Sequence, residues 1–349
     1  MLENWISEPK NDRNDFPDDT LGHSTIFGTN DDLDGKRNKV FIICDKSEFA
    51  SCVRSELYKL KNHFSTLHVI DVGDLKKVTS EFAISPLSEL SEEGRVVFIS
   101  QDDYFLNSIF QTLRHNNNSI SLNQINRNLA FYSQENNRRI LKSDKLFNLA
   151  VLGYQRHYCY KSDLEYIHNA FINHVSLGQL HENVDRCEPI IRACHGSVFN
   201  LNAIQGVEDN SGSISPNGMH AIEACQISKY SGINSQLRIY NITLGSLEPS
   251  KRVNSLAAQM IWYFLEGVSI SSKEDLVNKI NLQEHTVQTT IDDLYLTFWK
   301  SKTSGRWWFE IPSSSDDHSK IYPCSLEDYQ AACKNEITTY VMNQINIDH

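Results

Sequence analysis

KVFIIC (residues 39–44) is a run of β-branched, aromatic and aliphatic residues that predicts a buried β-strand. A helical pattern follows it, with Ser47 at the N-cap position and one apolar face formed by Phe49, Val53, Leu57, Leu60 and Phe64. A buried strand followed by an amphipathic helix is the unit from which parallel α/β sheets are built. This stretch therefore predicts the α/β fold class.

The same alternation continues along the chain. Further strands are expected at 67–71, 95–100, 119–125, 146–153, 188–193 and 238–244, and helices at 103–115, 219–230 and 256–266. Such alternation predicts a mostly parallel sheet with helices on both faces. Ligands bind such sheets at the C-terminal ends of the strands, so functional residues are expected there.

The N-terminal segment, residues 1–36, has a different composition. It contains nine acidic and three basic residues, which is −6 of the total net charge of −11, and it shows little apolar periodicity. These features predict an acidic, partly flexible leader, held by Trp5 or Phe27. Residues 37–349 are expected to form a single α/β domain.

The C-terminal part predicts a hairpin at about 294–312. LYLTFW (294–299) and RWWFEIP (306–312) flank the polar turn KSKTSG, SSSDDHS (313–319) is expected to be a solvated loop, and a capping box formed by Ser325 and Asp328 predicts the start of the final helix. The aromatic and basic residues between Trp299 and Trp308 suggest either a stacking platform for single-stranded nucleic acid or a hairpin that buries its aromatic rings. The acidic surroundings favour the second interpretation.

Composition excludes several classes of partner. With a net charge of −11, the chain would be repelled by the phosphates of nucleic acids and by anionic membranes, so we expect no nucleic-acid partner. No apolar run is long enough to cross a bilayer, and the N-terminus does not resemble a signal peptide, so we expect no membrane insertion. The eight cysteines form no CxxC pair, which favours reduced thiols and a cytoplasmic location.

Short catalytic motifs do not assign an activity. The chain has neither GxxxxGK[ST] nor GxGxxG, and it has no GxSxG elbow and no HExxH. His195, between Cys194 and Gly196, fits a structural role better than a catalytic one. Any functional assignment therefore depends on longer stretches of sequence.

Several longer stretches together resemble the ureohydrolase family, which includes arginases, agmatinases and formimidoylglutamases, and most closely its formimidoylglutamase-like branch. The resemblance covers most of residues 39–340 and rests on LFNLAVLGYQ (146–155), SPNGMHAIEACQISKYSG (215–232), AAQMIWYFLEG (257–267), FWKSKTSGRWW (298–308) and PCSLEDYQAACKNEI (323–337). It implies an arginase-like three-layer α/β fold. It also implies, for active members, two manganese ions at strand ends and a bridging hydroxide that attacks a guanidinium or formimino carbon.

The chain departs from the family at the expected metal ligands. Where the family has a GGxHD-like motif, this chain has FISQDDYFLN (98–107), so that Gln101 replaces the histidine and Asp102 matches the aspartate. In place of the family's SxDxD motif it has Asn200 and Asn202.

The DAHxD segment of the family corresponds to SLNQINRNL (121–129), with a register that is open by one residue. The two aspartates become Asn123 and Arg127 in one register, or Gln124 and Asn128 in the other. Neither register leaves a carboxylate or a histidine.

Neutral amides cannot offset the charge of two neighbouring divalent cations. We therefore expect no dinuclear manganese centre, no catalytic residue and no cofactor. A mononuclear site rebuilt around His195 or His220 is a weaker alternative. Glu223 matches the family position that approaches the substrate guanidinium, so a vestigial pocket would contain Gln101, Asp102, Asn123, Gln124, Asn128, Asn200, Asn202 and Glu223.

Two functions of different classes follow. The first is a catalytically inactive, ureohydrolase-like pseudoenzyme that binds a protein partner as a scaffold or as a subunit of a larger complex, with self-association into a homo-oligomer as a further possibility. The alternative is a metal-dependent hydrolase of linear amidines, guanidino or formimino compounds, with a rearranged site. Metal content and turnover after manganese loading discriminate the two.

Overall fold

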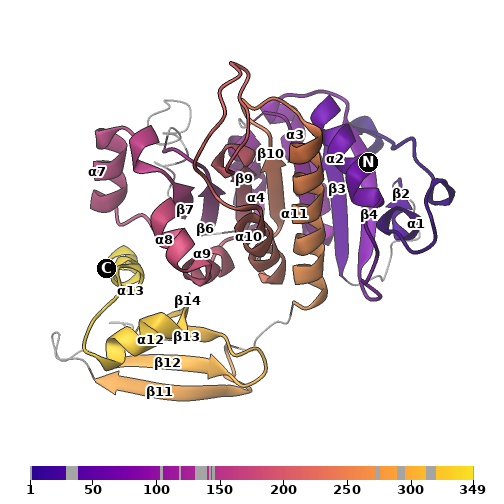
Figure 1. Ribbon diagram of the computed structural model, residues 1–349. Helices are drawn as coiled ribbons and strands as arrows, with labels where there is room; N and C mark the ends of the chain where they lie inside the picture. The colour runs from indigo at the N-terminus through magenta and orange to yellow at the C-terminus, as the bar shows by residue number, and fades with distance from the viewer. Residues whose placement is uncertain are drawn as a thin grey trace.

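The chain forms two β-sheets, a larger and mostly parallel one and a smaller antiparallel one (Figure 1). The computed structural model describes residues 2–28, 38–102, 105–117, 119–129, 140, 143, 146–271, 276–288, 295–311 and 320–348. The loop expected at 313–319 lies outside these residues.

The larger sheet has ten strands. Its spatial order is β1 (Ile6–Ser7), β4 (His68–Leu75), β3 (Lys39–Cys44), β5 (Arg95–Ser100), β10 (Ile239–Thr243), β9 (Gly196–Asn200), β6 (Ile120–Ile125), β7 (Leu146–Tyr154) and β8 (His174–Ser176), and β2 (Ile26–Phe27) also pairs with β4. Only the pairing of β1 with β4 is antiparallel among the pairs of this sheet within the described residues. The strands expected in this sheet are confirmed, except the one at 188–193.

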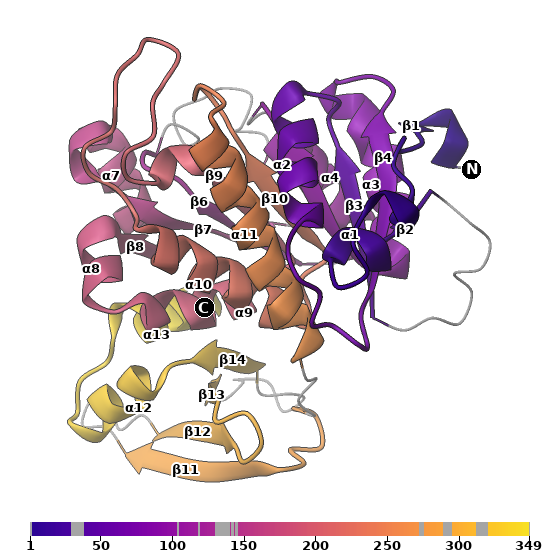
Figure 2. The same ribbon diagram turned by 45° about the vertical axis from the view of Figure 1, so that its right-hand side comes forward.

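Helices cover both faces of this sheet (Figure 2). One face packs against α1 (Leu21–Ser24), α2 (Glu48–Tyr58), α8 (Leu177–Glu182), α9 (Cys187–Arg192), α10 (Ala221–Ile233) and α11 (Lys251–Ser269). The other face packs against α3 (Ser80–Glu93), α4 (Leu106–Asn116) and α7 (Lys161–Asn169). The three-layer arrangement expected from the sequence is therefore confirmed.

Helices α10 and α11 cross at very short range. A Cβ atom on Gly232 would lie 2.0 Å from the carbonyl oxygen of Phe264, so only glycine permits this approach. The crossing fixes the position of α10, whose first turn contains Glu223.

The strand predicted at 188–193 is wrong, because these residues lie in α9 (Cys187–Arg192). Pro189 occupies the first turn of the helix, where no backbone N–H is needed for an intrahelical bond. Cys187, Ile190 and Ile191 are buried at helical spacing, and the apolar run that suggested a strand is in fact one face of a short helix.

The described part of the N-terminal segment, residues 2–28, belongs to the larger sheet and does not form a peripheral leader. Ile6 pairs with Leu75, and Ile26 pairs with Ile70. Trp5 packs edge-on against Phe82, with ring centroids 4.9 Å apart. Its acidic side chains face solvent, and its few apolar residues supply the contacts that determine its position.

The smaller sheet comprises β11 (Leu282–Gln288), β12 (Tyr295–Ser301), β13 (Trp307–Ile311) and β14 (Lys320–Cys324). The predicted hairpin is confirmed as β12 and β13, in which Trp299 lies opposite Trp308. Trp299, Trp307 and Trp308 are all buried. The stacking platform considered for nucleic acid therefore has no exposed tryptophan ring among these three residues.

Two helices complete the described chain. The capping box of Ser325 and Asp328 begins a helix as predicted, α12 (Leu326–Cys333), but this helix is not the final one. A second helix, α13 (Thr339–Asp348), was not predicted. It packs back on the larger sheet, where Asn343 lies 3.4 Å from Asn173.

All eight cysteines have free thiols, and five of them are buried. Burial raises the pKa of the Cys44 thiol to about 12, so this thiol stays protonated. No helix in the described part of the chain has the length and apolarity needed to cross a membrane.

Candidate functional site

The C-terminal ends of β5, β10 and β9 lie side by side. Ser100 pairs with Thr243, which pairs in turn with Asn200. The residues that follow these strands therefore meet at one edge of the sheet, which we call the carboxyl edge.

Gln101 lies at this edge, and its backbone makes the main contacts. Its N–H donates to Oδ2 of Asp45 at 2.6 Å, and its carbonyl oxygen accepts from the N–H of Gly245 at 2.7 Å. The side chains of Gln101 and Asp102 are both exposed. Neither side chain is therefore held as a buried ligand.

Asp45 is a buried carboxylate at this edge that the sequence reasoning missed. Its Oδ1 accepts from both the N–H and the hydroxyl of Ser47, at 3.0 and 2.5 Å. Burial raises the pKa of this carboxyl group, while these hydrogen bonds act against the shift. The residue directly follows KVFIIC, so applying the strand-end rule to the first predicted strand would have found it.

Asn200 and Asn202 lie together at the edge, and the backbone already occupies their oxygen atoms. Oδ1 of Asn200 accepts from the N–H of Asn202 at 3.0 Å, and Oδ1 of Asn202 accepts from the N–H of Arg127 at 3.2 Å. Both side chains are buried. A Cβ atom on Gly245 would lie 3.0 Å from Nδ2 of Asn200, so this amide fits against a glycine.

Asn123 and Gln124 do not join this group, because β6 continues to Ile125 before it ends. Asn123 lies inside the sheet and accepts from the hydroxyl of Ser197 at 2.7 Å. Gln124 is its neighbour in the strand and points to the opposite face.

The residue at the end of β6 is Asn126, which the sequence reasoning also missed. Its Oδ1 accepts from the N–H of Asn128 at 3.2 Å in a turn. Asn128 therefore lies just beyond the strand end, beside Arg127, so each of the two registers places one residue near the edge, Arg127 in the first and Asn128 in the second.

Glu223 lies in the first turn of α10, where it contacts two histidines. Its Oε1 is 2.7 Å from Nδ1 of His181, and its Oε2 accepts from the N–H of His220 at 2.8 Å. The rings of His181 and His220 are 4.8 Å apart. His181 was missed because it lies 42 residues away on α8.

These three residues could together bind a metal ion. One ligand atom from each of His181, His220 and Glu223 lies within 4.8 Å of the others, and it is the single group of this kind found among the described residues. Two imidazoles and one carboxylate suit a divalent transition metal with an open coordination position. His195, the other histidine considered, instead accepts from the N–H of Ser121 at the opposite edge of the sheet.

Comparison with known proteins identifies structures that have a similar fold. No family model and no curated protein matches the chain. Among solved structures, a Trypanosoma cruzi formiminoglutamase with Mn²⁺ aligns at a TM-score of 0.59 and 14% identity, over 67% of this chain and 94% of that chain. A Bacillus subtilis formimidoylglutamase aligns at 0.58 and 14% over 69% and 90%, and a hypothetical agmatinase from Burkholderia thailandensis at 0.55 and 15% over 69% and 88%.

The chain has the arginase-like fold. This confirms the fold expected from the sequence. The aligned region leaves about a third of the chain without a counterpart in these structures.

The carboxyl edge of this arginase-like fold does not fit a pair of manganese ions. The side chains of Asn126, Asn200 and Asn202 are neutral amides whose oxygens accept backbone N–H groups. Both oxygens of Asp45 accept hydrogen bonds as well. Divalent manganese favours anionic oxygen and imidazole ligands, and these residues offer neither in sufficient number.

Proposed function

We propose that this protein does not catalyse the hydrolysis of guanidino or formimino compounds and acts by binding a protein partner. The observation behind the proposal is that Asn200 and Asn202, which the family resemblance aligns with anionic ligands, have their oxygens bonded to the backbone. Two divalent ions at this edge would lack the negative charge that offsets their mutual repulsion. Such a site gives a water molecule no activation for attack on an amidine carbon.

Manganese loading tests the loss of catalysis. The purified full chain is incubated with excess Mn²⁺, its metal content is measured by mass spectrometry, and hydrolysis of arginine, agmatine and formiminoglutamate is assayed. We expect neither stoichiometric manganese nor turnover. Stoichiometric manganese with turnover would refute the proposal.

A variant with restored charge sharpens this test. Asn200→Asp with Asn202→Asp places two carboxylates at the carboxyl edge and should increase the manganese retained per chain. Asn11→Asp with Asn62→Asp adds the same charge away from that edge and should leave manganese retention unchanged. Equal retention in the two variants would show that the amides are not what excludes the metal.

The partner class rests on exposed aromatic side chains that follow β7. Tyr158, Tyr160 and Phe171 are exposed, with Tyr160 at 70% of its full accessible surface. Exposed tyrosines are frequent at protein interfaces because they contribute a large contact area at low entropic cost. The buried tryptophans of the smaller sheet are not available for this purpose.

Capture under native salt tests the partner. The full chain should retain a discrete protein in a fixed stoichiometry, and Tyr158→Ser with Tyr160→Ser should weaken that retention. Tyr295→Ser changes another exposed tyrosine, on β12, whose exposed fraction lies between those of Tyr158 and Tyr160, and is the matched control. Retention that is unaffected by the double variant would argue against this surface.

One observation favours a second function, a hydrolase with a rearranged metal site. His181, His220 and Glu223 form the group described above, and His220 and Arg252 line an adjacent pocket of about 340 Å³. Zinc or manganese bound there would polarise a carbonyl or imine of a substrate in that pocket. His181→Ala with His220→Ala should abolish both metal binding and turnover, whereas His157→Ala, an exposed histidine elsewhere, should change neither.

A further inference from the structure

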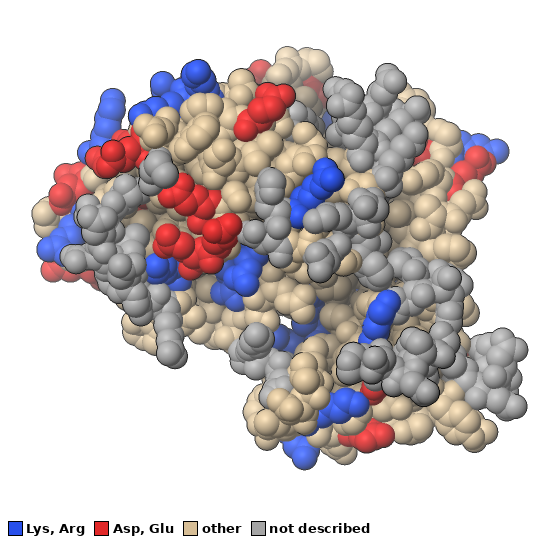
Figure 3. All heavy atoms as spheres, turned by 180° about the vertical axis from the view of Figure 1, so that it is seen from behind, with Lys and Arg blue, Asp and Glu red and all other residues tan. Residues whose placement is uncertain are grey.

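A cavity of about 880 Å³ lies between the larger and the smaller sheet. It opens at the amino edge of the larger sheet, where β9 and β10 begin, on the side opposite the carboxyl edge. In Figure 3, blue basic side chains border the hollow between the main body and the smaller sheet. The cavity is large enough for a small organic ligand.

The lining of this cavity is basic, although the chain as a whole is acidic. Three arginines and one histidine line it, Arg192, His195, Arg238 and Arg306, and none of the 14 lining residues in the described part of the chain is an aspartate or a glutamate. Arg192, His195 and Arg238 come from the larger sheet and its helices, and Arg306 precedes β13 of the smaller one. Positively charged side chains from both parts of the molecule therefore line the same cavity.

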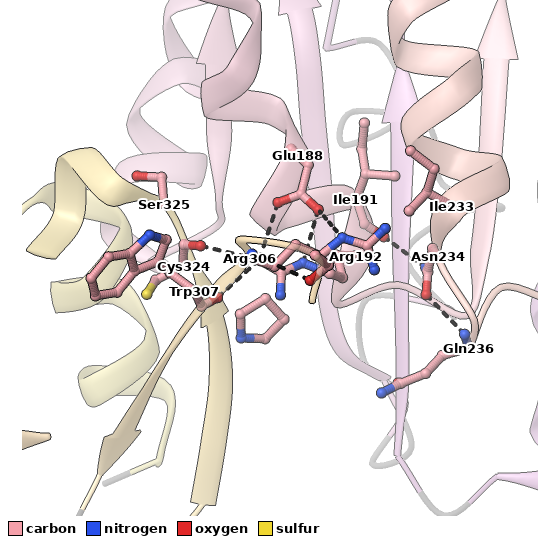
Figure 4. Close-up of polar contacts among 12 residues, drawn as sticks. Glu188, Ile191, Arg192, Ile233, Asn234, Gln236, Arg306, Trp307, Cys324 and Ser325 are labelled. Atoms are coloured by element: carbon pink, nitrogen blue, oxygen red, sulfur yellow. Dashed lines mark hydrogen bonds and ion pairs between the residues drawn. The ribbon is translucent and has the colours of Figure 1, made fainter. Parts of the chain in front are cut away.

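One nearby carboxylate offsets part of this charge (Figure 4). Glu188 Oε1 lies 2.9 Å from Nε of Arg192 and 3.9 Å from Nε of Arg306. Glu188 is thus shared by the charges of two guanidinium groups, and the charge of Arg238 adds to theirs at the cavity wall. Because the surroundings are partly buried, solvent screens that charge less than it would at an open surface.

Arg192 offers an unused donor at this wall, with its side chain more than nine-tenths buried. Its Nη2 donates to the carbonyl oxygens of Trp307 and Cys324 at 2.9 and 3.1 Å, while Nη1 is buried and makes no hydrogen bond. Its guanidinium carbon is 4.5 Å from the ring centroid of Trp308, which holds the group in place. A buried guanidinium N–H without an acceptor is costly unless a ligand supplies one.

His195 adds a second donor of defined orientation. Its Nδ1 accepts from the N–H of Ser121 at 3.1 Å, so the neutral ring has its proton on Nε2. Burial lowers the pKa of His195, and the charge of Arg238 adds to that shift. The ring is therefore a neutral donor beside the arginines.

The frame around these groups is rigid. Nδ2 of Asn234 donates to the carbonyl oxygens of Ile191 and Cys194 at 2.9 and 2.6 Å, and its Oδ1 accepts from the N–H of Gln236. These bonds link α9 to the start of β10 (Figure 4). A preorganised set of donors loses little entropy when a ligand binds.

We propose that this cavity binds a small polyanionic ligand, with phosphate or carboxylate groups held between Arg238 of the larger sheet and Arg306 of the smaller one. The guanidinium fork matches both groups through paired N–H donors. The size of the cavity admits a ligand as large as a nucleotide or a tricarboxylate. The site goes beyond the proposed function, since it lies at the other edge of the sheet and requires neither a metal nor a protein partner.

Binding of defined anions to the full chain tests the proposal. Inorganic phosphate, pyrophosphate and citrate are titrated by calorimetry, with sodium chloride at matched ionic strength as the blank. We expect saturable binding of at least one anion that weakens as salt increases. Tighter binding of pyrophosphate than of citrate identifies a phosphate ligand, and the reverse identifies a carboxylate ligand. Absence of saturable binding by all three anions would overturn the proposal.

Two variants locate the site. Arg238→Gln and Arg306→Gln should each weaken anion binding by roughly tenfold or more, as expected for loss of a charged hydrogen bond. Arg13→Gln removes an exposed arginine of the N-terminal segment and should leave binding unchanged. The near-ultraviolet circular dichroism of the buried tryptophans confirms that each variant is folded. Unchanged binding in both folded cavity variants would also overturn the proposal.

Discussion

At the carboxyl edge of the larger sheet, the neutral side chains of Asn200 and Asn202 accept hydrogen bonds from backbone N–H groups and add no charge. At the amino edge, Arg192, Arg238 and Arg306 line a cavity that has no lining carboxylate among the residues that the structure describes. In arginase-like folds the sheet positions residues at both edges equally well, because strand ends meet at each of them. The comparison indicates that one sheet can present neutral amide side chains at one edge and, together with a second sheet, basic side chains at the other.

The largest expected effect concerns the amino edge, where Arg192 connects the two sheets. Arg192→Ala removes the ion-pair partner of Glu188 and the donor to the carbonyl oxygens of Trp307 and Cys324. The free energy of unfolding should therefore fall by about 3–5 kcal/mol. Urea denaturation measures this change. Arg192→Lys keeps the positive charge but not the forked N–H donors of the guanidinium group, so it should lower the free energy of unfolding by less. If Arg192→Ala leaves this free energy unchanged, other contacts hold the smaller sheet in place.

A smaller effect is expected at the carboxyl edge. Gly245 has a φ of +66°, and an added Cβ would also press on Asn200, so Gly245→Ala should destabilise the protein by about 1–3 kcal/mol. Gly305→Ala is the matched control, since Gly305 has a φ of +72° and open space around its Cα. If both variants lose the same stability, the close packing of Asn200 against Gly245 makes no contribution of its own.

The smallest expected effect is a difference in how the two edges make the stability of the protein depend on pH. Burial lowers the pKa of His195 below its ordinary value of 6.5, so the unfolded chain binds the proton more readily and stability should fall as the pH drops below that value. Burial raises the pKa of Asp45 above its ordinary 3.8, so the folded chain binds this proton more readily than the unfolded chain. The stability that Asp45 contributes is therefore lost as the pH rises through its folded-state pKa.

Single variants separate these two contributions. His195→Asn keeps an acceptor for Ser121 and should flatten the loss of stability between about pH 7 and about pH 5. Asp45→Asn should instead remove the loss of stability that occurs as the pH rises above the ordinary pKa of an aspartate. Urea denaturation across a pH series measures both, and identical pH profiles for the wild type and His195→Asn would contradict the assignment.

Much of the fold could be predicted because the relevant signals are local. KVFIIC and RVVFIS are apolar over their whole length, as buried parallel strands require, and both are strands in the structure. The failure at 188–193 has an equally local cause. One buried helical turn and one buried strand produce the same short apolar run, and Pro189 fits the first turn of a helix.

The site was less predictable, because its geometry depends on where strands end and on contacts between distant residues. The predicted strand at 119–125 and β6 both end at Ile125, but the candidate residues Asn123 and Gln124 come from the family resemblance and not from this strand end, which brings Asn126 to the edge. Glu223 was identified, but its neighbour His181 becomes visible only once α8 packs beside α10. The basic cavity combines residues from α9, from the segments that precede β9 and β10, and from the smaller sheet, and no sequence window contains them together.

The pairing of β1 and β2 with β4 has a practical consequence for handling the protein. These two short strands cover the outer margin of β4, whose backbone N–H and C=O groups would otherwise be free to pair with another chain. Trimming the acidic N-terminus to obtain a more compact sample would expose that margin. Such a shortened protein should aggregate through intermolecular strand pairing, even though the segment removed is among the most charged parts of the sequence.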